Sequence, residues 1–197
     1  DKHKLRRNTL VVVVSEQGNQ FPFAKWTCYG SGLQSGMIAR WPGRIRAGAT
    51  SDTPVIGYDI LPTFVDVAEG DVVALSDELD GVSFPNLFKN PVWRPKRSLI
   101  WHFPFYHPEK TYSMAIDTVG IDDFVTSKTT PQSAIRTDNY KLIQFAQDDR
   151  AELYDLTADL SEQHDLSREQ PRIAAELRTE LDQQLKSMNA RLAIPRQ

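Results

Sequence analysis

Two adjacent oxygen-bearing side chains, Glu16 and Gln17, follow a run of five aliphatic residues at 10–14. Such a run is typical of a strand buried on both faces at the centre of a parallel sheet, and open α/β sheets bind ligands beyond the carboxyl ends of these strands. A carboxylate beside a carboxamide suits a hard cation such as Ca²⁺ or Mg²⁺, which needs about six oxygen ligands. The pair predicts part of a metal site; the alternative is the polar end of a strand that caps a turn.

A lysine, Lys25, lies in a long segment at 19–36 that is rich in aromatic residues and glycine. Long irregular segments of a compact domain are more often functional than not. A lysine near a cation can bind a tetrahedral oxyanion such as sulfate or phosphate as a point charge. The alternative is a solvated surface lysine.

Two histidines, His102 and His107, flank an aromatic segment at 104–106. Histidines among aromatic rings can hold a sugar ring or donate a proton to a leaving group, and the alternative is a packed aromatic cluster. The single cysteine, Cys28, lacks the surrounding residues of a nucleophile, so we expect a small buried residue.

The elements that would position these residues divide the chain into an α/β part over residues 1–95 and an antiparallel part over 96–197. In the first part we expect a second strand at 37–41 and a helix from Asp59 to Ala68, with Asp59 as its cap and Gly70 after its end. In the second part we expect strands at 98–103, 133–136, 140–145 and 152–156 and an amphipathic helix at 171–192, whose apolar stripe extends to Met188 and Leu192.

Composition excludes several classes of protein. The 197 residues are 40% hydrophobic and carry a net charge of −3, which gives no electrostatic argument for a nucleic-acid partner. The longest apolar run is far too short to cross a membrane. The chain starts with Asp1 and a basic segment, and the first part has few strands, so we expect that a portion on the N-terminal side is missing.

Taken in order, several segments resemble the C-terminal half of a type I sulfatase of the alkaline phosphatase superfamily. The segments that carry this resemblance are Ser15-Glu16-Gln17-Gly18 after the strand, the Lys25–Gly32 loop, Arg40-Trp41-Pro42-Gly43, Asp59-Ile60-Leu61-Pro62-Thr63, Leu79-Asp80-Gly81-Val82-Ser83, Ala134–Ile143 and Glu152–Leu156. The resemblance spans residues 8–190. It implies the C-terminal portion of a sulfatase-type mixed α/β sandwich, followed by a small antiparallel sheet packed by a C-terminal helix.

The resemblance also implies roles for the residues singled out above. Glu16 and Gln17 stand where Asp and Asn or His are usual among the ligands of the active-site Ca²⁺, and both side chains are longer by a methylene. Lys25 would bind the sulfate group and act in catalysis. His102 lies in a Trp-His-Phe-Pro segment that in several polysaccharide sulfatases approaches the substrate, so we expect a substrate contact there.

The sulfatase nucleophile, a formylglycine made from Cys or Ser in Cys-x-Pro/Ala-x-Arg, has no counterpart here, because Cys28 is followed by Tyr29-Gly30-Ser31. The resemblance therefore implies a chain that is inactive alone and whose partner is the N-terminal part of the same periplasmic or extracellular sulfatase. The substrate would be a sulfated glycan or a small sulfate ester. Two alternatives are a phosphate or phosphonate ester hydrolase of the same superfamily and a non-catalytic glycan-binding remnant.

Overall fold

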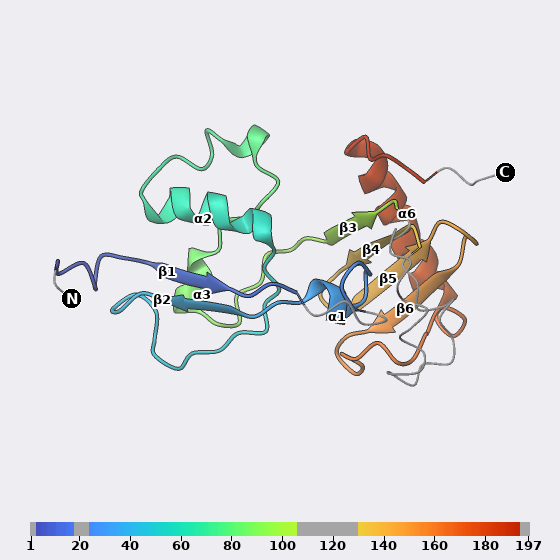
Figure 1. The fold of residues 1–197 in the computed structure, drawn as a ribbon, viewed down its shortest axis with the longest axis horizontal. Helices are drawn as coiled ribbons and strands as arrows, with labels where there is room; N and C mark the ends of the chain where they lie inside the picture. The colour runs from blue at the N-terminus through green and yellow to red at the C-terminus, as the bar shows by residue number, and fades with distance from the viewer. Residues whose placement is uncertain (1–2, 18–23, 106–129, 194–197) are drawn as a thin grey trace, which may run out of the picture. The chain divides into compact units, whose positions relative to one another are not determined.

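The computed structural model describes residues 3–17, 24–105 and 130–193. The chain divides into two compact units, Asp1–Ser15 with Gly36–Arg97 and Glu16–Ser35 with Ser98–Gln197. The segment that carries Lys25 groups with the second unit, whereas the sequence places it with the first. The predicted division at 95/96 into domains stays a prediction. Figure 1 shows the elements of each unit in chain order.

A two-stranded antiparallel ribbon forms the start of the first unit. Strand β1 (Val11–Val14) pairs with β2 (Met37–Arg40) in the register Val11↔Arg40 to Val14↔Met37. The predicted strand and its successor are confirmed, but a parallel strand buried on both faces is wrong for the described residues, because Val11, Val13 and Val14 are about half exposed. The β-branched run favours extended backbone whatever covers it.

Short helices organised around one buried carboxylate complete this unit. They are η1 (Gly57–Asp59), α2 (Ile60–Val67), η2 (Ser76–Glu78) and α3 (Pro85–Lys89). The predicted side-chain cap of α2 is wrong: the Asp59 carboxylate instead accepts hydrogen bonds from the amides of Ile56 at 2.9 Å and Val82 at 3.0 Å. Arg97 pairs with both of its oxygens. The carboxylate therefore joins three separated segments rather than one helix end.

The second unit is built on a four-stranded antiparallel sheet in the order β3-β4-β5-β6. Its strands are β3 (Leu99–Phe103), β4 (Gln132–Arg136), β5 (Tyr140–Phe145) and β6 (Ala151–Asp155). All four confirm the predicted strands within one or two residues. Together with the helices, these strands give the mixed α/β fold class that the sequence predicts.

The helix α6 (Pro171–Ser187) covers one face of this sheet (Figure 1). Leu177, Leu181 and Leu185 pack against side chains from the three inner positions Ile135, Leu142 and Leu153. The helix ends five residues before the predicted limit, because Asn189 adopts a left-handed φ of 51° and the Ala190 amide bonds back to the Leu185 carbonyl at 2.9 Å. This is a Schellman ending. Met188 and Leu192, predicted on the apolar stripe, are consequently exposed.

The other face of the sheet is covered by the segment 24–35, which includes the short helix α1 (Gly30–Leu33). Cys28, Tyr29 and Leu33 pack there against Ala134, Ile143, Phe145, Tyr154 and Leu156. Because side chains alternate along a strand, residues next to each other in one strand face α6 and this segment in turn. Thus the sheet has an apolar face toward α6 and a second face toward the segment that contains Lys25.

Candidate functional site

The structure brings together two of the predicted site residues, Lys25 and Glu16. The Lys25 Nζ donates to Glu16 Oε1 at 2.6 Å, and the Glu16 side chain is 72% exposed. The hydrogen bond and the charge of Lys25 lower the pKa of Glu16 below its usual range. Gln17, the next residue, is also exposed. An ammonium group and a carboxylate are therefore paired in the second unit, and the exposed Gln17 follows the carboxylate directly in the chain.

A tight turn fixes the backbone around Lys25. The carbonyl of Ala24 accepts from the Thr27 amide at 3.0 Å and from Thr27 Oγ1 at 2.6 Å. Trp26 adopts a left-handed φ of 76°, which is rare for a bulky residue and indicates strain maintained by the surrounding structure. A side chain at Gly32 would lie 2.2 Å from the Ala24 carbonyl oxygen, so only glycine fits there. We call residues 24–33 the Lys25 turn.

Three consecutive residues of the Lys25 turn bond to side chains far away in the sequence. The Cys28 amide donates to Gln132 Oε1 at 2.8 Å, and the Gly30 amide donates to Glu162 Oε2 at 2.6 Å. Between them, the Tyr29 hydroxyl donates to Glu152 Oε2 at 2.6 Å. Sequence reasoning missed all three acceptors, because each lies more than a hundred residues from its donor.

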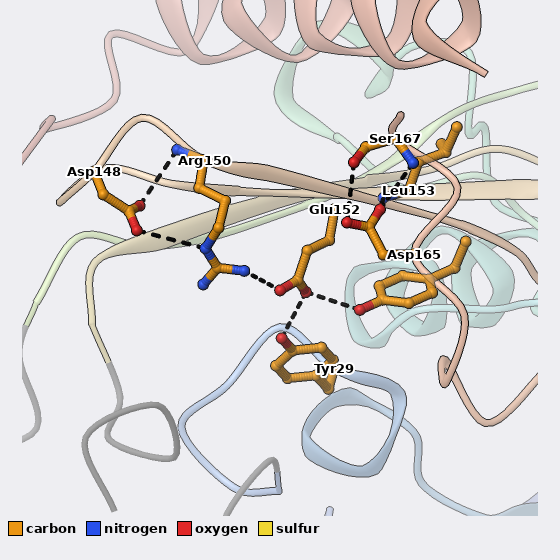
Figure 2. Close-up of polar contacts among 8 residues, drawn as sticks. Tyr29, Asp148, Arg150, Glu152, Leu153, Asp165 and Ser167 are labelled. Atoms are coloured by element: carbon orange, nitrogen blue, oxygen red, sulfur yellow. Dashed lines mark hydrogen bonds and ion pairs between the residues drawn. The ribbon is translucent and has the colours of Figure 1, made fainter. Parts of the chain in front are cut away.

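Figure 2 shows the polar network around Glu152. Its Oε2 accepts from the hydroxyls of Tyr29 and, at 2.8 Å, Tyr154, while Arg150 pairs with the other oxygen and lies over the Phe145 ring at 3.8 Å. Burial, and next the hydrogen bond to Glu152, raise the pKa of Tyr29. The phenol therefore remains a hydrogen-bond donor across the usable pH range and keeps its place on the carboxylate.

A buried ion pair supports the end of the Lys25 turn. Lys141 Nζ lies 2.6 Å from Glu162 Oε1, and the two side chains are 3% and 4% exposed. Burial lowers the pKa of Lys141, and the charge of Glu162 acts against that shift. The same surroundings bury Cys28 and raise its pKa to about 12. The prediction of a small buried cysteine is thus confirmed, and the thiol has none of the thiolate character of a nucleophile.

The structure does not bring His102 together with Lys25. Its Nε2 bonds to the Arg191 carbonyl oxygen at 2.8 Å and its Nδ1 to Ser133 Oγ at 2.8 Å. Because a carbonyl oxygen only accepts, Nε2 carries a proton. In the alternation of β3, His102 lies on the α6 face with Ile100, opposite the face that holds the Lys25 turn. Substrate binding by His102 stays a prediction, and His107 lies outside the described residues.

Aromatic rings from the Lys25 turn and from residues 103–105 lie side by side. The Trp26 and Phe103 ring centroids are 5.9 Å apart, as are those of Phe103 and Phe105. Trp26 and Phe105 are both exposed. We call these three rings the aromatic row. The aromatic row therefore gives the unit that holds Lys25 a partly exposed apolar surface, and one of its rings, Trp26, follows Lys25 directly in the chain.

Within the described residues, no group of three or more His, Cys, Asp or Glu side chains is arranged to hold a metal ion. The side chains of Glu16 and Gln17 could supply at most three of the roughly six to eight oxygen ligands that Ca²⁺ takes. None of the helices in 3–17, 24–105 and 130–193 is long and apolar enough to cross a membrane.

Comparison with known families decides the relationship. Residues 18–191 match the family described as N-sulphoglucosamine sulphohydrolase, C-terminal. The chain belongs to this family. The resemblance to the C-terminal part of a sulfatase, drawn from the ordered motifs, is thereby confirmed. The match includes the Lys25 turn and its three acceptors, whereas Glu16 and Gln17 lie just before the first matched residue.

Curated relatives of this chain agree with the family assignment. A sulfatase of Formosa agariphila is 28% identical over 184 residues, which cover 85% of this chain and 30% of the relative. An N-acetylglucosamine-6-O-sulfatase of Bacteroides thetaiotaomicron is 28% identical over 167 residues, covering 81% of this chain and 26% of the relative. The chain thus spans less than a third of these relatives.

Solved structures share the fold. A protein solved in complex with its substrate D-glucosamine-2-N,6-O-disulfate superposes with a TM-score of 0.69 at 24% identity, over 94% of this chain and 35% of that one. A 2-O glycosaminoglycan sulfatase superposes with a TM-score of 0.67 at 24% identity, over 92% of this chain and 37% of that one. The predicted sulfatase-type α/β fold is confirmed.

Proposed function

We propose that this chain is the C-terminal part of a sulfatase that hydrolyses sulfate esters of glycans. The observation that carries the proposal is Lys25, whose ammonium group lies beside Glu16 on a turn held by three acceptors, in a chain of the sulphohydrolase family. The curated relatives carry the names sulfatase and N-acetylglucosamine-6-O-sulfatase. A fixed ammonium group suits a sulfate oxygen on which negative charge grows during hydrolysis.

Glu16 and Gln17 fit two ligands of a Ca²⁺ ion in this proposal. Their oxygens are the hard donors that Ca²⁺ prefers, both residues are exposed, and Lys25 keeps the Glu16 carboxylate ionised. When bound, Ca²⁺ would polarise the sulfate group as a Lewis acid. Lys25 would hold the sulfate by one oxygen and offset the charge that develops there. The formylglycine nucleophile and the remaining ligands would come from the N-terminal part of the same protein.

The aromatic row supports a glycan as the substrate. Sugar rings present apolar C–H faces that pack against aromatic rings, and Trp26 and Phe105 are exposed beside the Lys25 turn. A small aryl sulfate would fill less of this surface. Because polymeric sulfated glycans lie outside the cytoplasm, the proposal places the protein in the periplasm or outside the cell.

The exposed ribbon supports the N-terminal part of the same sulfatase as the partner. Val13 is 58% exposed and Ile38 is 70% exposed, although both lie in paired strands. Exposed β-branched side chains on a ribbon indicate a surface that a further layer of protein covers. The chain alone would then lack both its covering layer and its nucleophile, and we expect it to be inactive.

The test uses the full-length protein with matched sulfate and phosphate esters of one aryl alcohol and with N-acetylglucosamine 6-sulfate. We expect hydrolysis of the sulfates and loss of activity on removing Ca²⁺ by chelation. Lys25→Ala should lower kcat/KM by roughly 10²–10³, as the loss of one oxyanion donor does. Lys89→Ala, at an exposed lysine of α3, is the matched control and should leave the rate unchanged.

Two results would contradict the proposal. Turnover of the phosphate ester in preference to the sulfate would assign a phosphate or phosphonate ester hydrolase. Binding of sulfated glycans without turnover and without dependence on Ca²⁺ would assign a non-catalytic glycan-binding remnant. Equal rates for Lys25→Ala and Lys89→Ala would show that Lys25 takes no part in the reaction, even if the protein is an active sulfatase.

A further inference from the structure

We infer that Glu162 is a positioning residue for Lys25, acting through the backbone amide of Gly30. This inference rests on the proposed function, because it assigns Lys25 to the sulfate. Glu162 lies in the connection between β6 and α6, far from Lys25 in the sequence, and its carboxylate bonds to Lys141 and to the Gly30 amide.

The carboxylate of Glu162 divides its two oxygens between two donors. Oε1 accepts from Lys141 Nζ at 2.6 Å, and Oε2 accepts from the Gly30 amide at 2.6 Å. Lys141 comes from the inner strand β5, where its neighbours on both sides are paired. The lysine therefore fixes the carboxylate against the sheet, and the carboxylate in turn fixes the first amide of α1.

Stability alone gives little reason for this arrangement. A buried ion pair loses in desolvation about what it gains in attraction, and well-packed apolar residues in its place are often neutral or stabilising. Glu162 also holds a left-handed φ of 57°, which costs free energy for a residue with a side chain. What the pair does supply is a charged acceptor at a fixed point, and hydrogen bonds to charged acceptors are the stronger ones.

The position of Gly30 is coupled to Lys25 through close contacts inside the turn. Gly32, which follows in α1, packs so closely on the Ala24 carbonyl that no Cβ fits between them. Ala24 precedes Lys25 directly. A displacement of α1 away from Glu162 would therefore move the Ala24 carbonyl and the base of the Lys25 side chain together.

The first test compares two double variants of the full-length protein. K141M/E162Q replaces the ion pair by neutral side chains and keeps an oxygen that can accept from the Gly30 amide. K141M/E162L shares the first substitution but replaces the carboxamide by an aliphatic group, which leaves the Gly30 amide without this acceptor. We expect kcat/KM for sulfate ester hydrolysis to be about tenfold lower for K141M/E162L than for K141M/E162Q, since a misplacement of about 1 Å can cost up to 10² in rate.

A second pair of variants removes the donor instead of the acceptor. Gly30→Pro deletes the amide hydrogen, and Tyr29 already has the extended backbone, with φ of −73° and ψ of 158°, that a residue before proline needs. Gly30→Ala keeps the hydrogen. Its Cβ would lie 3.3 Å from the flexible end of Gln34 and 3.5 Å from Glu162 Oε2, which is an ordinary van der Waals contact. We expect Gly30→Pro to repeat the loss seen with K141M/E162L and Gly30→Ala to keep most of the activity. This pair decides the question should K141M/E162L fail to fold.

If the loss of kcat/KM depends on the presence of Lys25, Glu162 positions that residue and does not act only through general stability. In the Lys25→Ala background the two double variants should have equal kcat/KM, because the group being positioned is absent. Equal rates for the two doubles with Lys25 present would overturn the inference. So would a tenfold difference that persists in the Lys25→Ala background, since the effect would then not pass through Lys25.

Hydrogen exchange by mass spectrometry tests the positioning without any turnover. Peptides covering 24–33 should exchange at least tenfold faster in K141M/E162L than in K141M/E162Q, while peptides from α6 exchange alike. Faster exchange in a protein that hydrolyses no sulfate ester would refute the proposed function and leave the structural link between Glu162 and the turn intact. Equal exchange at 24–33 would overturn the link itself.

Discussion

Gly32→Ala most directly tests whether the Lys25 turn must be closed, that is, whether Gly32 must pack directly on the Ala24 carbonyl. Alanine ordinarily favours a helix over glycine, so propensity alone predicts a small gain of up to about 1 kcal/mol in α1. The added Cβ, however, would lie 2.2 Å from the Ala24 carbonyl oxygen, 2.6 Å from the Thr27 carbonyl oxygen and 2.9 Å from Thr27 Oγ1. Ordinary contact begins at 3.4 Å, so the nearest oxygen would have to move by about 1 Å.

We expect this overpacking to cost about 1–3 kcal/mol in the free energy of unfolding. Because Ala24 precedes Lys25, we also expect kcat/KM for sulfate ester hydrolysis to fall by about 10–100-fold. The matched control is Gly57→Ala, where a Cβ meets nothing within 4 Å. Urea unfolding and steady-state kinetics of both variants give the two quantities. A Gly32→Ala protein as stable and as active as Gly57→Ala would refute the requirement for a closed turn.

Three further predictions concern the rest of the chain. Asp59→Asn should destabilise the protein by about 3 kcal/mol in urea unfolding, because it leaves Arg97 without its counter-ion at a fully buried site, and a loss below about 1 kcal/mol would contradict this. The raised pKa of Cys28, about 12, means that the unfolded thiol ionises first as pH rises. The contribution of this thiol to the free energy of unfolding is therefore fully present below pH 9 and falls above it. The free energy of unfolding of the wild type should therefore fall by about 1 kcal/mol more than that of Cys28→Ala between pH 7.5 and pH 10. Leu181→Ala should cost about 2–5 kcal/mol and Met188→Ala less than about 0.5 kcal/mol, since the first side chain is buried and the second exposed.

Elements that depend on local pattern could be predicted from the sequence. The hairpin of β4 and β5 has alternating side chains around a polar turn at 137–139, and α6 repeats leucine at helical spacing. Its end was predicted too late, because the left-handed backbone at Asn189 stops the helix while the apolar pattern continues beyond it. The spacing of apolar residues predicts which face of a helix is buried, but it does not predict the residue at which the helix ends.

Features that depend on distant partners could not be predicted in this way. The valines of β1 indicate a strand equally well whether they are buried or exposed, so the pattern could not show that they line an exposed ribbon. Lys25 and Glu16 were found because residue type and motif point to them. Gln132, Glu152 and Glu162 carry no local signal, since a polar residue becomes an acceptor for the turn only once the sheet and its connections have folded.

One face of the four-stranded sheet contributes mainly to stability, and the other face holds the Lys25 turn in position. Toward α6 the inner positions are Ile135, Leu142 and Leu153, each with no exposed surface. At positions of opposite alternation along the same strands lie Gln132, Lys141 and Glu152, which face the Lys25 turn and hold it directly or through Glu162. Large-to-small substitutions on the first face should therefore lower the free energy of unfolding with little change in kcat of the folded protein. Neutral, volume-conserving substitutions of the polar residues on the second face, with Lys141 and Glu162 replaced together, should lower kcat with little change in the free energy of unfolding. A plot of kcat against the free energy of unfolding should therefore separate the variants into two groups by the face they occupy. A single common line would mean that the sheet supports Lys25 only through its overall stability.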